Sequence, residues 1–263
     1  MRYDKKDVNH TYPYLRLDRV HAMFYRTAEV EGAVQAVDIA NSDAPWAGWV
    51  QLVRQALDTT VSLPDDQLLL MRDLTGRSFR PREPAPGIIP RIGAVLIALY
   101  PDDADLRLLL TVRSNHVASH RGEVSLPGGA TDPDDAGPVA TALRECAEEL
   151  GIATDTVTVL GTLTPVYIPP SNFRITPVVG MLDAPPHLTI NRDEVERVIT
   201  VTLRELLDPA TVMVEHWKLH GHDVLVPFFA IAGYKVWGAT ALILSELVAR
   251  MRHARIAYNA EAS

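Results

Sequence analysis

The sequence predicts a mixed α/β protein of the α+β type, and three observations support this class. Apolar runs rich in β-branched residues or leucine recur after residue 90, as buried strands require. Segments with helical spacing of apolar residues lie before, between and after these runs. The 263 residues, of which 47% are hydrophobic, suffice for one large domain or for a domain with an appendage.

The first 75 residues predict an N-terminal helical extension in which we find no chemical motif. Residues 46–60 and 63–74 have apolar spacing compatible with helices, and Pro64 with the two aspartates after it suits a first helical turn. Four prolines between Gly76 and Pro90 cannot continue a helix or a central strand. The expected division is an extension over 1–75, a Pro-rich linker over 76–90 and the main domain over 91–255.

The main domain is expected to alternate strands and helices. Two apolar runs separated by "PDDAD" predict a β-hairpin of residues 91–100 and 106–112. A helix is expected to end at Gly151, because glycine readily adopts the left-handed conformation that terminates helices. Further strands are expected over 156–167, 174–182 and 195–203, and further helices over 203–209 and 239–257.

Composition narrows the class of protein and its surroundings. A formal net charge of -8 argues against a general binder of nucleic acid or of anionic membranes, because such proteins usually carry a basic face. Cys146 is the single cysteine, so an intrachain disulfide is excluded. The first ten residues do not resemble a secretory signal, and the apolar run over 92–100 is about half as long as a membrane helix. We therefore expect a cytoplasmic protein with no nucleic-acid or membrane partner, and the sequence leaves a homodimer open.

The helix that ends at Gly151 carries an unusual cluster of charge. Glu145, Glu148 and Glu149 lie in its last two turns, where they repel one another by roughly 0.2 to 0.5 kcal/mol per pair and face the negative end of the helix dipole. Helical geometry places them opposite an apolar face that contains Cys146. A solvated acidic surface and a cation site both explain such a cluster.

The glycines before this helix favour the cation site. Gly128 and Gly129 form a tight loop whose backbone carbonyl groups could join the carboxylates as ligands. Oxygen atoms converging on one side are what Mg²⁺ or Mn²⁺ requires. Asp134 or Asp135 is expected to cap the start of the helix, and Cys146 is expected to be a small buried hydrophobic residue rather than a nucleophile.

The segment "GGATDPDDAGPVATALRECAEELGI" resembles a Nudix box, whose pattern is Gly-x5-Glu-x7-Arg-Glu-U-x-Glu-Glu-x-Gly-U with U aliphatic. Its second half matches fully from Arg144 to Ile152, with Cys146 in an aliphatic position. In the first half Asp135 replaces the glutamate, and one extra residue lies between it and Arg144. The same expansion is usual in the coenzyme A pyrophosphatase branch of the family.

A second segment, "LLLTVRSNHVASHRGEVSLPGG", resembles the signature that precedes the box in coenzyme A pyrophosphatases. Arg113 and Ser114 match, whereas Ala118 stands where the signature has a second arginine and Leu126 replaces a phenylalanine. Three nearby residues could supply the missing positive charge: His116, His120 and Arg121. The resemblance extends over much of the region from Ile92 to Met251, and it implies that residues 113, 114, 116, 120 and 121 bind substrate.

The resemblance implies a Nudix fold, in which a mixed sheet is sandwiched between helices, and a Nudix hydrolase domain over 91–255. It implies a metal site built from Glu145, Glu148, Glu149 and a carbonyl group of Gly128 or Gly129, with Arg144 bracing the catalytic glutamates. Glu194 is a candidate general base, although its sequence context favours an exposed surface position. The cofactor is expected to be Mg²⁺ or Mn²⁺.

The implied activity is hydrolysis of the pyrophosphate bond of coenzyme A, its oxidised form or its acyl derivatives. The products would be 3′-phosphoadenosine 5′-phosphate and a phosphopantetheine. Ala118 keeps open a second substrate class, a small nucleotide such as ADP-ribose, a dinucleotide or an oxidised nucleotide. A third hypothesis is a Nudix domain that only binds nucleotides or a partner protein, against which the complete set of box glutamates argues.

Overall fold

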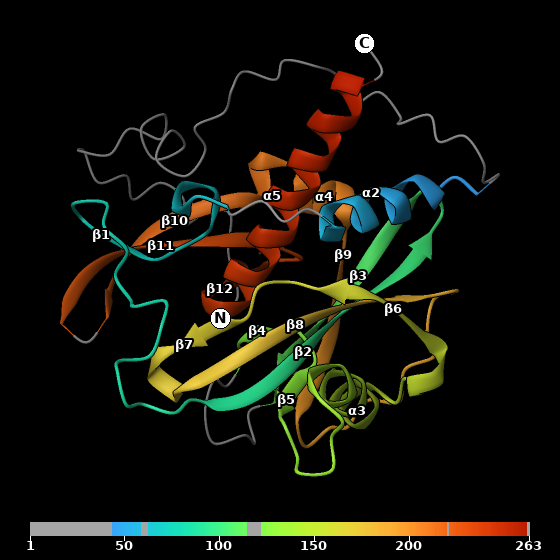
Figure 1. Ribbon diagram of the computed structural model, residues 1–263, viewed down its shortest axis with the longest axis horizontal. Helices are drawn as coiled ribbons and strands as arrows, with labels where there is room; N and C mark the ends of the chain where they lie inside the picture. The colour runs from blue at the N-terminus through green and yellow to red at the C-terminus, as the bar shows by residue number, and fades with distance from the viewer. Residues whose placement is uncertain (1–43, 59–62, 115–121, 220, 262–263) are drawn as a thin grey trace.

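The computed structural model describes residues 44–58, 63–114, 122–219 and 221–261, with side chains up to Arg255. Within these ranges the chain forms two β-sheets with helices packed around them (Figure 1). The larger sheet carries the glutamate helix, and the smaller sheet lies beside the long C-terminal helix. The fold class is therefore mixed α/β, as the sequence predicts.

The larger sheet is built around the predicted hairpin. Strands β2 (Arg91–Asp102) and β3 (Asp105–Arg113) pair antiparallel, with Leu99 opposite Leu108. The path of paired strands runs β4, β3, β2, β8, β6, and the β2–β8 pairing is parallel, so the sheet is mixed. The other members are β4 (Val124–Ser125), β5 (Gly128–Ala130), β6 (Val157–Thr162), β7 (Val166–Ile168), β8 (Phe173–Leu182) and β9 (Val195–Thr202).

Helices cover both faces of this sheet because its central strand is apolar on both sides. Along β2, Ala94, Leu96 and Ala98 pack in one buried cluster with residues of helix α3 (Pro138–Leu150). The alternate residues Ile97 and Leu99 belong to a second cluster on the opposite face. That cluster includes side chains of α2 (Ala47–Asp58) and α5 (Gly238–Glu261). The predicted sheet between helices is confirmed.

The second sheet was not predicted from the sequence. Its central strand β11 (His222–Ile231) pairs with β10 (Val212–Leu219), β12 (Tyr234–Trp237) and the short β1 (Arg72–Asp73). The chain enters this sheet through α4 (Leu203–Leu207), whose capping box joins Thr202 and Glu205. Single-turn 3₁₀ helices complete the described elements: η2 (Asp65–Gln67), η3 (Thr154–Thr156), η4 (Pro169–Ser171) and η5 (Pro209–Thr211).

The region before β2 departs from the sequence prediction in one place. The helix predicted over 46–60 is confirmed as α2, but the helix predicted over 63–74 is wrong. There the chain makes only the η2 turn and then β1, because Leu69 donates its backbone N–H to the Ser245 hydroxyl and Arg72 lies opposite Leu225 of the second sheet. Tertiary contacts therefore override a helical pattern in this segment. Among the described residues, no helix is long and apolar enough to cross a membrane.

Candidate functional site

The glycine loop lies directly beneath the glutamate helix. Gly128 has a φ of +152°, and a Cβ atom there would lie 2.3 Å from the carbonyl oxygen of Ala94. At Gly129 a Cβ atom would lie 2.5 Å from the carboxyl carbon of Glu145. Both positions need glycine because β5 pairs with β2 while α3 packs closely over it. The sequence "GG" thus allows the backbone to approach the carboxylate of Glu145.

Helix α3 begins without a side-chain cap and ends at a glycine. Its N-cap is Gly137, followed by Pro138, and no side chain caps it. The predicted N-cap role of Asp134 or Asp135 is therefore wrong. At the other end, Gly151 has a φ of +72° and closes the helix, as predicted.

Asp135 instead binds the side chains of α3. Its carboxylate accepts two hydrogen bonds from Arg144, from Nε at 3.0 Å and from Nη2 at 2.9 Å. It also accepts the Thr141 hydroxyl at 2.9 Å and the backbone N–H of Asp132 at 2.9 Å. The hydrogen bond with Arg144 is the main reason that the pKa of Asp135 lies well below its usual range. Asp135 therefore remains ionised and fixes the guanidinium.

Arg144 connects this aspartate to two of the three glutamates. Its Nη1 atom donates to Glu145 Oε1 at 3.1 Å and to Glu148 Oε2 at 3.1 Å, and its Nη2 atom donates to the carbonyl oxygen of Ala130 at 3.0 Å. The Glu148 side chain is 54% exposed, whereas that of Glu145 is 15% exposed. Desolvation raises the pKa of Glu145, and the Arg144 charge opposes that shift.

Glu149 has a different environment. It is 4% exposed, and its Oε2 atom is buried without a hydrogen-bond partner among the described residues. Burial raises its pKa to about 8, and the negative charge of Glu194 adds to the shift. The charge of Arg113 and the backbone N–H of Gly128 act in the opposite direction. A buried carboxylate without sufficient compensation is uncommon in structural positions and common in functional ones.

The charge of Glu194 acts on this carboxylate because the loop that carries Glu194 closes the end of α3. The backbone N–H groups of Thr189 and Asn191 donate to the carbonyl oxygens of Leu150 and Glu149, at 2.8 and 2.9 Å. The backbone N–H of Ser114 donates to the carbonyl oxygen of Glu194 at 2.8 Å. The loop thus joins the end of β3 to the glutamate helix, and Glu194 is half-buried rather than exposed as the sequence suggested.

Comparisons with known proteins identify the family of this chain. The family model for the NUDIX domain matches residues 90–220. An uncharacterized Nudix hydrolase NudL from Enterobacter sp. (strain 638) is 37% identical over 169 residues, which is 64% of this chain and 87% of that protein. This chain belongs to the Nudix hydrolase family. The prediction of a Nudix enzyme is confirmed at this level.

Other relatives in the Nudix family carry more specific names. Human mitochondrial coenzyme A diphosphatase NUDT8 is 40% identical over 159 residues, or 59% of this chain and 66% of the human protein. The mitochondrial Nudix hydrolase 15 of Arabidopsis thaliana is 38% identical, and the match covers 56% of that protein. A crystal structure of a MutT/nudix family protein from Enterococcus faecalis is 17% identical with a TM-score of 0.42, over 67% of this chain and 66% of that one. The family assignment rests on the sequence matches.

The site of this Nudix chain brings together most, but not all, of the predicted residues. Described side chains from β3, α3 and the loop before β9 meet beside Gly128 and Gly129. Arg113 acts on Glu149 through its charge, and its Nε atom is buried with no hydrogen-bond partner among the described groups. Ser114 is buried beside it. His116, Ala118, His120 and Arg121 lie outside the described residues.

The donors fit a hard divalent cation by their chemistry. Among the described side chains, no group of three or more His, Cys, Asp or Glu residues is arranged to ligate a metal as it stands. The buried, unpartnered Oε2 atom of Glu149 nevertheless needs positive charge, and Glu145 and Glu194 add negative charge beside it. Carboxylate oxygens are ligands that Mg²⁺ and Mn²⁺ prefer. Cys146 is buried, which raises the pKa of its thiol to about 12, so it is unsuited to be a nucleophile.

Two residues of the candidate site differ from what the sequence predicts. Asp135 is not the predicted helix cap, and its place in the Nudix box pattern, where a glutamate is usual, signals a partner for Arg144. Glu194 is not at the predicted surface position, and its local sequence contains no signal for burial. Only the docking of residues 189–194 on α3 brings it to Glu149.

Proposed function

We propose that this Nudix hydrolase cleaves the pyrophosphate bond of coenzyme A or its derivatives with Mg²⁺ or Mn²⁺ as cofactor. The products would be 3′-phosphoadenosine 5′-phosphate and phosphopantetheine or its acyl form. The observation that carries the proposal is the meeting of Arg113 and Ser114 with Glu149 and Glu194 at one end of α3. These two residues belong to the segment that resembles the coenzyme A pyrophosphatase signature, and the human relative named above is a coenzyme A diphosphatase.

The proposed metal ligands are Glu145, Glu148 and Glu149, with a carbonyl group of Gly128 or Gly129. When bound, divalent cations neutralise pyrophosphate oxygens and lower the pKa of a water molecule. Arg144 holds Glu145 and Glu148 in place through its hydrogen bonds and is itself fixed by Asp135. This arrangement keeps two of the carboxylates oriented before substrate binds.

Arg113 and Glu194 complete the proposed reaction. The positive charge of Arg113 beside Glu149 is placed to attract a pyrophosphate oxygen. We assign proton acceptance to Glu194, which is half-buried and near enough for its charge to act on Glu149. The oxygen of water attacks one phosphorus atom, its proton passes to Glu194, and the bond from that phosphorus to the bridging oxygen breaks. The bridging oxygen leaves with the second phosphate.

A substrate panel with identification of products by mass tests the proposal. Coenzyme A should give a higher kcat/KM than ADP-ribose, and removal of its 3′-phosphate should lower kcat/KM by about ten- to a hundred-fold, the usual range for one charge-assisted contact. Excess chelator should abolish turnover, and added Mg²⁺ or Mn²⁺ should restore it. If ADP-ribose or a dinucleotide is the best substrate, the coenzyme A assignment fails and a different Nudix substrate class takes its place.

A further inference from the structure

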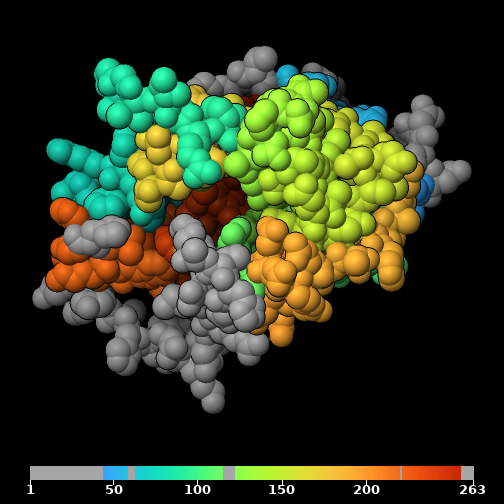
Figure 2. Space-filling model, turned by 90° about the horizontal axis from the view of Figure 1, so that it is seen from below, coloured from blue at the N-terminus to red at the C-terminus, as the bar shows by residue number. Residues whose placement is uncertain are grey.

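A cavity of about 370 Å³ lies between the segment that precedes β2, the loop that includes β7 and the start of α5. Ligand pockets in proteins are typically about 300 to 1,000 Å³, so it is large enough for part of a small molecule. In Figure 2 a deep hollow opens beside the residues that include α3, and the dark red residues of α5 form its floor. One wall comes from the loop that includes β7, from Thr164 to Pro169.

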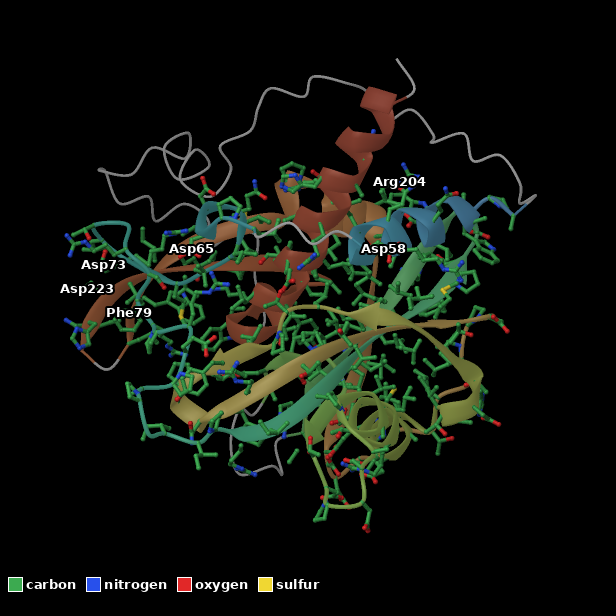
Figure 3. The ribbon with its side chains drawn as sticks, viewed as in Figure 1. Asp58, Asp65, Asp73, Phe79, Arg204 and Asp223 are labelled. Carbon is green, nitrogen blue, oxygen red and sulfur yellow. The ribbon has the colours of Figure 1, made fainter. Side chains whose placement is uncertain are left out.

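Most of the cavity wall lies outside the segment that matches the family. Residues 68–71 and 78–83 precede that segment, and Gly238, Ala239, Leu242 and Glu246 follow it. The earlier stretch is held against the second sheet, where the ring of Phe79 lies 5.7 Å from that of His222. Figure 3 shows Asp65, Asp73 and Phe79 on the same side of the molecule as Asp223 of β11. Residues on both sides of the matched segment therefore enclose most of the pocket.

The floor of the cavity is connected to the catalytic loop. In the first turn of α5, the Thr240 hydroxyl donates to the carbonyl oxygen of Val124 at 3.2 Å. Val124 belongs to β4, and four residues later the chain reaches Gly128. Ala239 and Leu242, which line the cavity, flank Thr240 in α5. In the larger sheet Ala130 pairs with Gly93, Gly93 with Ile175, and Ile175 with Val166 of the cavity wall. That wall therefore lies three strand spacings, or about 14 Å, from the glycine strand, a distance that an extended substrate cut beside Gly128 can span.

The lining suits a mainly apolar ligand segment. Leucine, methionine, proline, valine, isoleucine and alanine side chains make up most of it. Most of its polar side chains are already bound within the protein. Tyr167 donates to the Asn172 side chain at 3.1 Å, and the Thr164 hydroxyl donates to Glu246 at 2.7 Å. The remaining pairs are Arg82 with Asp65, Glu83 with Arg174, and the Ser78 hydroxyl with the carbonyl oxygen of Arg80.

Arg80 is the exception in this lining. Its side chain is half-buried, and among the described residues its guanidinium has no hydrogen-bond or ion-pair partner. Burial alone lowers the pKa of Arg80, and no neighbouring carboxylate opposes the shift. Five N–H donors therefore remain available next to an apolar surface. A ligand segment with methyl and methylene groups and a few carbonyl oxygens satisfies both features.

We propose that this cavity receives the pantetheine arm of the substrate, with Arg80 donating hydrogen bonds to its amide carbonyl oxygens. The proposal rests on the proposed coenzyme A activity. The arm is built from apolar carbon groups interrupted by two amides, which matches the walls and the guanidinium. Adenosine carrying a 3′-phosphate is a poorer fit, because its several polar edges would compete with internal pairs that are already formed.

A larger side chain in the cavity wall tests which part of the substrate the cavity receives. Ala239→Phe should weaken binding of 4′-phosphopantetheine by about tenfold or more, as changes of pocket shape commonly do. Binding of 3′-phosphoadenosine 5′-phosphate should stay unchanged, and both are measured by calorimetry with Mg²⁺. Ala210→Phe, at an exposed position in η5, is the matched control and should change neither. If Ala239→Phe weakens the adenosine product instead, or neither product, the assignment is overturned.

A second variant keeps the test independent of changes in folding. Arg80→Met preserves a long apolar side chain and removes the donors, so it should raise the Kd of 4′-phosphopantetheine by about tenfold. It should lower kcat/KM for coenzyme A and for 3′-dephospho-coenzyme A by equal factors, because both carry the arm. Arg77→Met, at an exposed position in the preceding turn, is the control. A loss confined to coenzyme A would assign Arg80 to the 3′-phosphate and overturn the proposal.

The outcomes separate this proposal from the proposed function. If the unaltered protein prefers ADP-ribose over coenzyme A, the proposed function fails. If coenzyme A is preferred but neither Ala239→Phe nor Arg80→Met changes the affinity for 4′-phosphopantetheine, only the cavity assignment fails.

Discussion

The glutamates of helix α3 have two different environments, a paired half of the candidate site around Arg144 and an unpaired half around Glu149. Around Arg144, Glu145 and Glu148 share one guanidinium, which Asp135 holds from the other side. Glu149, one turn after Glu145, is buried with one oxygen unpartnered among the described residues, and the charge of Glu194 acts on it. In the first half, one positive charge is shared by three carboxylates and offsets only part of their negative charge. The second half carries a free-energy cost that a bound cation would relieve, because burial of unpaired charge is unfavourable.

The largest effect is expected where charge is least compensated. Glu149→Gln should reduce turnover by about 10² to 10³-fold or more, because it removes a charge on which transition-state stabilisation depends. In metal-free buffer its Tm should stay equal or rise, since a buried carboxylate is replaced by a neutral amide. Steady-state kinetics and thermal unfolding with and without Mg²⁺ measure both. Mg²⁺ should raise the Tm of the unaltered protein more than that of the variant.

Glu148→Gln sharpens this comparison. Glu148 is the exposed member of the paired half, so its substitution should reduce turnover less than Glu149→Gln. Equal losses, or near-normal turnover in Glu149→Gln, would remove the distinction between the two halves.

A smaller effect is expected from loosening the paired half. Asp135→Asn weakens the support of Arg144, and loss of such a supporting contact typically lowers metal affinity or activity by about 10 to 100-fold. The Mg²⁺ concentration for half-maximal activity should rise, which a purely structural defect would not produce. Asp135→Glu, which introduces the residue usual in the Nudix box, should recover more activity than Asp135→Asn. Asp134→Asn, at the exposed neighbouring position, is the control and should have no effect on activity. If Asp135→Asn leaves the Mg²⁺ requirement unchanged, that result contradicts the role of Asp135 in positioning Arg144.

The smallest effect concerns pH and stability. The pKa of Glu149 is about 8 in the folded protein against 4.5 for an ordinary glutamate, so the folded state binds this proton more tightly than the unfolded state does. In chelator, its contribution to the free energy of unfolding is complete below pH 4.5 and is lost as pH rises through about 8. The loss is on the order of a few kcal/mol at most. In denaturant titrations between pH 5 and about pH 9, the free energy of unfolding should decline less steeply with pH for Glu149→Gln than for the unaltered protein. Parallel pH dependences of the two proteins would contradict this expectation.

The sequence predicted correctly those parts of the fold that residues close together in the chain specify. The β2–β3 hairpin follows from two apolar runs joined by a short polar turn, and the end of α3 follows from Gly151. The helix predicted over 63–74 failed because its polar backbone groups and Arg72 find partners in α5 and the second sheet. The second sheet was missed, since the run in β11 has no alternating pattern and its partners are distant in the chain. The division into an extension, a linker and a Nudix domain stays a prediction.

The sequence by itself determined the family, the carboxylate helix and the glycine loop, because these lie within one continuous segment whose residue order carries the chemistry. Only the tertiary structure decided which carboxylate is unpaired, that the charge of Glu194 acts on it, and that residues before and after the family segment enclose a cavity. The physical reason is that pairing, burial and enclosure depend on groups far apart in the chain. Their distances are fixed by packing, which no local pattern encodes.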